Sequence, residues 1–209
     1  MNRKEIVKHL TETANEVQGD INAYERKAGQ LRQGMVHLRR SDMFVAKGDF
    51  ANATKESIDA VKYLPDCIEA IRSAADTHFS MEQYSQALSY YVDLIKKYPS
   101  LRDIHYQIGR CYTELKDHPK AIPEYEKEIA LSGEAPDVHL QIGFAYQRVA
   151  EDILHTMNKQ PIADSGKKRT ECKAAFTKAK ENYAKGIGAV DQDTINDWIR
   201  DIDAVLKTI

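Results

Sequence analysis

The sequence predicts an all-α protein built as a solenoid of about four helix pairs. Three observations support this prediction. The chain has 209 residues with only 10 Gly and 6 Pro, and a low content of these helix breakers favours helix over strand. A pattern of small, aromatic and aliphatic residues recurs every 34 residues between about 34 and 191, as in repeats that each form two antiparallel helices. The residues before this region carry apolar side chains at helical spacing.

The first 33 residues are expected to form an N-terminal helical segment. From Ala14 to Leu38 the apolar residues follow one another at alternating steps of 3 and 4, which is the heptad pattern of a coiled coil. Two interpretations fit this pattern. The segment could pack on the first repeat and cover its open end, or it could form a homodimer through residues 6–38.

The repeat region is expected to span residues 34–191, with helix pairs at about 34–64, 68–98, 102–131 and 136–190. Its clearest copy has landmarks at Tyr84, Ala87, Tyr91, Leu94 and Pro99. The residues 34 positions earlier and later are Phe50, Ala53, Ser57, Ala60 and Pro65, and His118, Ala121, Tyr125, Glu128 and Gly133. In the third copy, Pro123 is expected in the first turn of a helix that begins between Pro119 and Ile122, because proline is tolerated there and disrupts a helix interior.

The last repeat is expected to contain an insertion at residues 150–173. The alanine that the period places at position 155 occurs instead as Ala179, a displacement of 24 residues. This insertion predicts that both helices of the last pair are longer than the others. Residues 192–209 carry Ile195, Trp198 and other apolar residues at helical spacing, which predicts a C-terminal capping helix.

The repeated residues resemble the tetratricopeptide repeat, whose signature is W-x2-L-G-x2-Y…A-x3-F…P. The runs Ile108-Gly109-x2-Tyr112 and Ile142-Gly143-x2-Tyr146 match it well, whereas the first copy has Arg40 where an apolar residue is usual. The resemblance implies a right-handed α-solenoid whose first helices line a concave groove that binds peptides or partner helices. The groove residues implied on this sequence are Arg72, Asp76, Phe79, Tyr106, Arg110, Phe144 and Arg148.

A second candidate surface is the basic stretch Lys167, Lys168 and Arg169 inside the insertion. One interpretation is a solvated face that attracts the acidic C-terminal helix weakly. The other is a projection that docks an acidic partner through charge complementarity.

Composition and motifs exclude several classes of function. The net charge is −2, so no nucleic-acid partner is expected, and no apolar run is long enough to predict a membrane span. The start lacks the apolar stretch of a secretory signal and the three cysteines are too few and scattered for a disulfide framework, so a cytoplasmic location is expected. No nucleotide-binding, zincin or hydrolase motif occurs, so no catalytic residue, cofactor or metal site is expected. His37, His105 and His139 are related by the repeat period and are expected to pack as structural residues.

The function expected from the resemblance is that of a non-catalytic adaptor or scaffold, which binds another protein through the groove. Two alternatives remain open: a chaperone for secreted or assembling client proteins, and an intracellular peptide-sensing regulator. A chaperone would hold an extended segment of its client, a sensor a short free peptide, and an adaptor a folded or helical partner.

Overall fold

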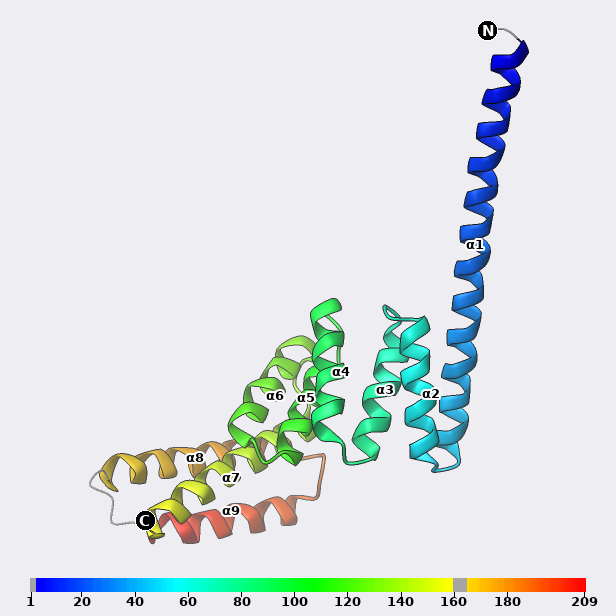
Figure 1. Cartoon of the computed structure of the whole chain (residues 1–209). Coiled ribbons are helices and arrows are strands. Elements are labelled where there is room, and N and C mark those ends of the chain that lie inside the picture. The colour runs from blue at the N-terminus through cyan, green and yellow to red at the C-terminus, as the bar shows by residue number, and fades with distance from the viewer. Residues whose placement is uncertain (1–2, 160–164) are drawn as a thin grey trace. The chain divides into compact units, whose positions relative to one another are not determined.

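The structure is a computed structural model that describes residues 3–159 and 165–209, and it is helical almost throughout this part of the chain (Figure 1). The helices are α1 (Arg3–Ala46), α2 (Phe50–Tyr63), α3 (Ile68–Ser80), α4 (Tyr84–Lys97), α5 (Ile104–Glu114), α6 (His118–Ser132), α7 (Pro136–Lys159), α8 (Ser165–Lys185) and α9 (Gln192–Leu206). The described residues contain no strand, and a single isolated bridge joins Ile187 to Val190 in the turn before α9. The all-α prediction is confirmed, and the helices lie where the period predicts them. The predicted pair at 68–98 corresponds to α3 and α4, whose packing on each other is not established.

The chain divides into an N-terminal unit, Met1–Met81, and a C-terminal unit, Glu82–Ile209. In the N-terminal unit, α1 packs against α2 and α2 packs against α3. In the C-terminal unit, contacts run from α4 to α5, from α5 to α6 and onward to α9. Each helix therefore packs mainly against its neighbours in the sequence, as expected for a solenoid built from helix pairs.

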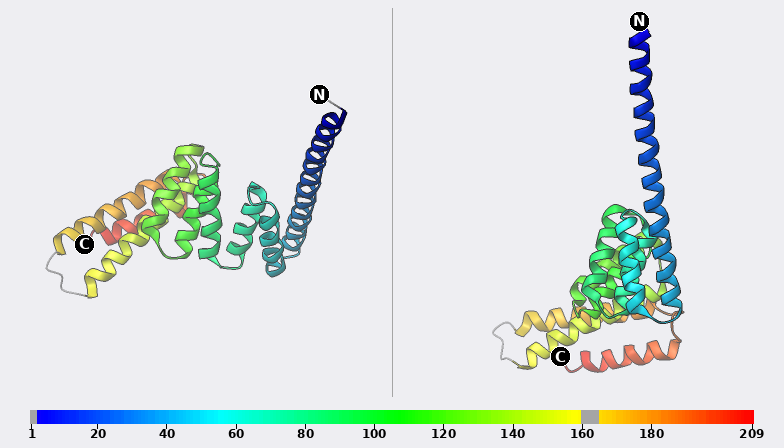
Figure 2. Two further views of the ribbon diagram at one scale, coloured as in Figure 1. Left: turned by 45° about the horizontal axis from the view of Figure 1, so that its top comes forward. Right: turned by 45° about the vertical axis from the view of Figure 1, so that its right-hand side comes forward.

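The N-terminal segment does not fold back over the first repeat. Helix α1 is a single helix of 44 residues, and Figure 2 shows its first part extending well beyond α2 and α3. The side chains from Lys8 to Gln33 are exposed, and only the glycine at position 29 is half-buried. The first buried residue is Gly34, where an added Cβ would lie 2.3 Å from Cγ of Leu64. The interpretation of this segment as a cap is wrong for the residues described, because nothing in the unit covers their apolar side chains.

A glycine and a tyrosine hold the two helices of each later pair close together. A Cβ on Gly109 would lie 2.5 Å from the ring of Tyr125, and one on Gly143 would lie 2.7 Å from the ring of Tyr183. Both tyrosines are fully buried. The two contacts have the same spacing in sequence once the 24 inserted residues are removed. The glycine and the tyrosine of the repeat therefore recur at a fixed spacing because they form the same steric contact in both pairs.

Three repeat-related histidines also link the two helices of their own pairs. Nδ1 of His37 lies 2.6 Å from a carboxylate oxygen of Glu56, and Nδ1 of His105 lies 2.7 Å from one of Glu124. The corresponding ring nitrogen of His139 lies 3.0 Å from the amide oxygen of Asn182. No group of three or more metal-ligating side chains occurs among the described residues. These histidines act as structural residues, as the sequence predicts.

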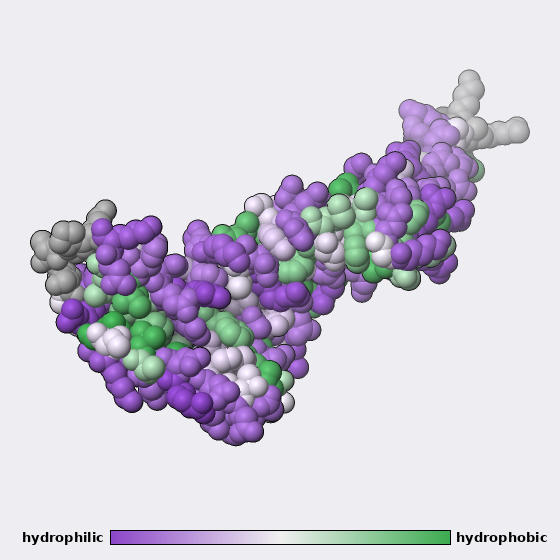
Figure 3. Space-filling model, turned by 90° about the horizontal axis from the view of Figure 1, so that it is seen from below, coloured by the Kyte–Doolittle hydropathy of each residue, from purple (hydrophilic) through white to green (hydrophobic). Residues whose placement is uncertain are grey.

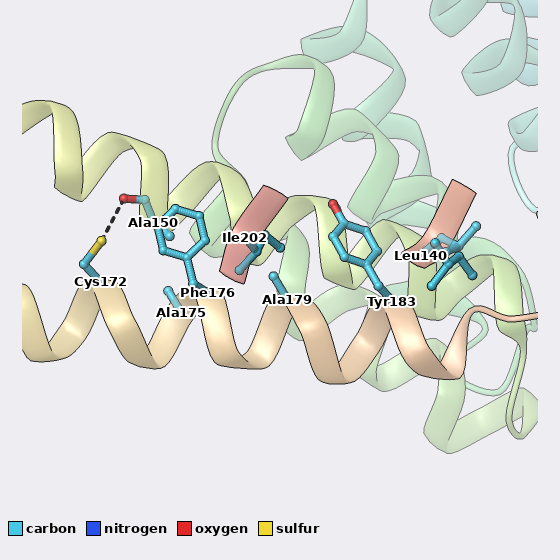
Figure 4. Packing of buried hydrophobic residues seen from close by; sticks show 9 residues of the cluster. Leu140, Ala150, Cys172, Ala175, Phe176, Ala179, Tyr183 and Ile202 are labelled. Atoms are coloured by element: carbon cyan, nitrogen blue, oxygen red, sulfur yellow. Dashed lines mark hydrogen bonds between the residues drawn. The ribbon is translucent and has the colours of Figure 1, made fainter. Parts of the chain in front are cut away.

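Helices α7 and α8 of the last pair are longer than α2 to α6 and have their own core (Figure 4). Helices α7 and α8 contain 24 and 21 residues, whereas α2 to α6 contain 11 to 15. The turn expected within the insertion, residues 161–166, lies mostly outside the described residues. The thiol of Cys172 on α8 donates to the carbonyl of Ala150 on α7 at 3.4 Å, and Ile202 from α9 completes the cluster.

Helix α9 covers the apolar face of the long pair. Its buried residues are Ile195 and Ile202, and it begins at an N-cap where the carboxylate of Asp191 accepts from the amide of Thr194 at 2.8 Å. Figure 3 shows apolar residues, in green, gathered beside the grey atoms at the free end of the pair. Half-buried residues such as Met157 and Leu206 belong to the edge of this cluster.

The position of Pro123 differs from the prediction. Helix α6 begins at His118, one residue earlier than expected, and Pro123 lies inside it. The earlier start is stabilised by the carbonyl of Asp117, which accepts from the amides of Lys120 and Ala121 at 3.0 and 3.1 Å. Proline at position 123 removes the amide that would bond the carbonyl one turn earlier, but Pro123 is exposed, so water can solvate that carbonyl.

Candidate functional site

A cavity of about 610 Å³ lies in the C-terminal unit between α5, α6 and α7. The end of α5 and the turn after it supply Thr113 and Lys116, and the first residue of α6 supplies His118. The residues from α7 are Gln141, Phe144, Ala145, Arg148 and Asp152. They recur every three or four positions and so line one face of that helix. This site, called the α5–α7 cavity below, contains two of the predicted groove residues, Phe144 and Arg148.

His118 is the polar group of the cavity that lacks a partner. Its side chain lines the cavity but is only 7% exposed, and Nδ1 has no hydrogen-bond partner among the described residues. Burial lowers the pKa of His118, although the carboxylate of Asp152 acts in the opposite direction. The imidazole is therefore neutral near pH 7. A buried nitrogen without a partner costs free energy, and a ligand in the cavity can supply the missing hydrogen bond.

Phe144 provides a fixed apolar surface. Its ring is 36% exposed, and its other face meets Tyr183 of α8 and Trp198 of α9 at centroid distances of 5.3 and 5.1 Å. Such aromatic contacts hold a ring in place. The C-terminal helix therefore has two roles here, since it covers the core of the long pair and supports the ring at the cavity.

The charges of the cavity are two basic groups and one acidic group. Lys116 and Arg148 are exposed, and Asp152 lies one turn beyond Arg148 on α7. Arg148 also pairs with Glu151 at 2.7 Å, but the arginine side chain is 62% exposed. An ion pair this exposed contributes little, so Arg148 can exchange Glu151 for an anionic group of a ligand.

The other predicted groove residues do not join this cavity. Arg72 and Asp76 line a separate cavity of about 370 Å³ in the N-terminal unit, together with residues of α1 such as Asp42. Phe79 is half-buried on α3 and is not among the residues that line it.

In the C-terminal unit, Tyr106 packs on Tyr125 at a centroid distance of 5.7 Å. The side chain is half-buried at the edge of the core, and this burial raises the pKa of Tyr106. Arg110 donates to the amide oxygen of Gln107 at 3.0 Å. Of the basic stretch near the start of α8, Lys167 and Arg169 are exposed and Lys168 is half-buried.

Sequence reasoning missed Lys116, His118, Gln141 and Asp152. A signal for His118 was present, because the residues 34 and 68 positions earlier are the aromatic residues Tyr84 and Phe50. A polar ring at a position that is aromatic in the other copies indicates a local requirement for hydrogen bonding. Lys116 lies exposed in the turn after α5, and Gln141 and Asp152 lie on a half-buried and an exposed position of α7. No periodic pattern distinguishes these three residues.

A chain of helix pairs with a lined cavity between successive pairs is a helical-repeat protein. Residues 69–100 match the family model described as tetratricopeptide repeat. This match, together with the repeat contacts seen in the later helix pairs, supports the resemblance to the tetratricopeptide repeat. Repeats of this kind support a general role in protein–protein interaction.

Individual proteins are also similar to this chain. The chain is 30% identical over 110 residues to Superkiller complex protein 3 of Mus musculus. The matched region covers 50% of this chain and 7% of that relative. It therefore spans only a small part of the relative's length. A crystal structure of MamA matches with a TM-score of 0.54 and 21% identity over 83% of this chain and 92% of that one.

A MamA structure from Desulfovibrio magneticus RS-1 matches with a TM-score of 0.55 and 13% identity, over 84% of this chain and 96% of that one. At this level of identity the likeness concerns the fold alone. Among the described helices, none combines the length and the apolar composition that crossing a bilayer requires.

Proposed function

We propose that this protein is a non-catalytic, cytoplasmic interaction scaffold that binds an extended segment of a partner protein in the α5–α7 cavity. The observation that carries the proposal is the unpartnered Nδ1 of His118, buried at a cavity of about 610 Å³. A cavity of this volume is within the range of sites that bind small ligands. It accommodates a few side chains of a linear segment, and this favours peptide recognition over docking of a folded domain.

The chemistry of the cavity defines the segment that fits it. An apolar side chain packs on the exposed face of Phe144, and a main-chain or side-chain polar group bonds to Nδ1 of His118. A carboxylate placed beside the apolar residue meets Lys116 and Arg148, because these two cations outnumber Asp152 in the lining. The proposed ligand is a peptide with adjacent apolar and acidic residues. The sequence predicts a folded or helical partner for an adaptor, and the size of the cavity changes this expectation to an extended segment. The proposed scaffold differs from a chaperone or a sensor of free peptides because it recognises one motif within a longer partner, whereas those would accept a wider range.

Selection of displayed random linear peptides on the full chain tests this proposal. Selected peptides should share an apolar residue next to Asp or Glu. Their affinity should fall at least tenfold, about 1.4 kcal/mol, for the variant Lys116→Glu/Arg148→Glu. The matched control is Lys167→Glu/Lys168→Glu, which makes the same change in charge on the second candidate surface. Peptides that bind the cavity variant like the wild type and fail on the control would assign binding to α8 and refute the site.

His118→Leu tests the hydrogen bond separately. Removing the ring nitrogen should weaken the selected peptides by several-fold, because the ligand then loses its buried partner. The thermal unfolding midpoint of the variant should stay close to that of the wild type, since Nδ1 makes no hydrogen bond in the free chain.

The second part of the proposal concerns self-association. We propose that the chain forms a homodimer through the exposed apolar positions of α1, which lie within residues 6–38; the side chains are described from Lys8 onward. The dimer is independent of the cavity, because it uses only side chains of the N-terminal unit.

A further inference from the structure

The projecting part of α1 carries an apolar stripe that no other part of the N-terminal unit covers. The large residues of this stripe are between 45% and 75% exposed, and they are Leu10, Val17, Ile21, Tyr24, Leu31 and Met35. Ala14 and Ala28 complete the heptad positions between them. From Leu10 to Met35 the stripe extends over roughly 38 Å of helix. A continuous apolar stripe of this length on an isolated helix is typical of a coiled-coil strand.

The charged residues beside the stripe determine how a second copy fits it. One edge carries Asp20 and then Lys27, and the other edge carries Glu25 and then Arg32. Both edges therefore have the same order along the chain, with the acid first and the base one heptad later. In coiled coils, residues at these flanking positions form the interhelical ion pairs that set orientation.

A parallel pair brings unlike edges together. The edge with Asp20 and Lys27 then faces the edge with Glu25 and Arg32 of the second copy, in the same order. Asp20 meets Glu25 and Lys27 meets Arg32, and both contacts occur twice because the dimer is symmetric. Both of these charged pairs are then repulsive.

An antiparallel pair brings like edges together with their order reversed. Asp20 then faces Lys27 of the second copy on one side, and Glu25 faces Arg32 on the other. Both kinds of ion pair form when residue 26 of one copy lies opposite residue 26 of the other. The core contacts then join Tyr24 to Ala28, and Ile21 to Leu31, of the second copy, so the largest ring meets the smallest side chain.

We propose that α1 of two copies forms an antiparallel coiled coil, held by the apolar stripe from Val17 to Met35 and oriented by Asp20–Lys27 and Glu25–Arg32 ion pairs. This inference rests on the proposed homodimer and adds the identity of the surface and its orientation.

The variant Lys27→Glu distinguishes the two orientations by the sign of its effect. In the antiparallel dimer the new carboxylate faces Asp20, and the dimer Kd should rise roughly three- to tenfold at low salt and less at high salt. In a parallel dimer it would face Arg32 and tighten association. The matched control is Arg26→Glu, one residue away on the outer face, which makes the same change in charge and should leave the Kd unchanged. Sedimentation equilibrium of the full chain measures all three proteins.

Disulfide capture gives a second, independent readout. In a Cys67→Ala background, Val17→Cys and Met35→Cys chains are mixed and oxidised without denaturant. The antiparallel pairing predicts a disulfide between the two different chains, because Val17 lies opposite Met35. Capture of Val17→Cys with itself would show a parallel dimer; this refutes the inference and leaves the homodimer standing. A chain that stays monomeric at all concentrations would refute both, without bearing on peptide binding in the cavity.

Discussion

Replacing Gly109 by alanine tests whether the glycine–tyrosine contact determines how closely the two helices of a repeat pack. The added Cβ would lie 2.5, 2.7 and 2.9 Å from three atoms of the Tyr125 ring. Carbon atoms in contact normally stay about 3.5 Å or more apart, so the ring and the added carbon have to separate by about 1 Å. The ring cannot move freely, because it is fully buried and its hydroxyl lies 3.0 Å from that of Thr113.

The magnitude follows from two opposing effects. Overpacking of a buried contact costs about 1–3 kcal/mol, whereas glycine to alanine inside a helix gains about 1 kcal/mol. The expected net loss is up to about 2 kcal/mol. With a urea dependence of about 2 kcal/mol per molar, the midpoint of unfolding should fall by up to about 1 M.

Fluorescence of Trp198, the single tryptophan of the chain, reports the unfolding of the C-terminal unit. Gly166→Ala is the matched control in the same unit, because no atom lies within 4 Å of the added Cβ. The control should be neutral or slightly stabilising. If Gly109→Ala unfolds at the same urea concentration as this control, the repeat spacing does not arise from this contact.

Three other predictions concern the core, a buried imidazole and the thiols. Ala87→Leu should lower the stability of the C-terminal unit by about 1–3 kcal/mol, because Ala87 is fully buried. Ala130→Leu, at an exposed position, should leave the stability unchanged. Equal urea midpoints for the two variants would show that Ala87 does not lie in a close helix contact. Burial lowers the pKa of His118, so its contribution to stability is complete above the unfolded pKa of about 6.5 and is lost as pH falls below it. The unfolding free energy of the wild type should fall relative to that of His118→Gln between about pH 8 and pH 5, and a difference that does not change with pH would refute the assignment. Burial raises the pKa of both Cys67 and Cys172, but Cys67 is only half-buried whereas Cys111 and Cys172 are buried. Accessibility therefore predicts that a thiol reagent modifies Cys67 first in the native chain and the other two cysteines only after unfolding, as mass spectrometry of the digested chain can show.

The sequence predicts those parts of the fold that rest on contacts repeated in every copy. Gly109 and Gly143, with their tyrosines, recur because each helix pair needs the same close approach. The period alone therefore locates the helices. The insertion was found by the same reasoning, since Ala179 and Tyr183 keep their phase after a shift of 24 residues.

The parts that the sequence did not predict depend on neighbours outside one repeat. The groove position of Tyr106 stays a prediction, because its half-buried ring packs on Tyr125 and the exposure of that ring depends on how closely the two helices pack. The course of α1 is a further case, because the heptad pattern is the same whether a helix covers a repeat or meets another chain. The α5–α7 cavity combines residues of three helices, and a search for single landmarks does not bring Lys116 and His118 together.

The position of the 24-residue insertion makes the length of the last helix pair independent of how that pair stacks on α6. The additional residues come after the Gly143–Tyr183 contact on α7 and before it on α8, so they extend both helices at the end where they join. The surface that stacks on α6 lies at the opposite end and keeps the geometry of an ordinary repeat. Insertions or deletions in this segment can therefore lengthen or shorten α7 and α8 at their joined end. The packing of α7 on α6 does not change.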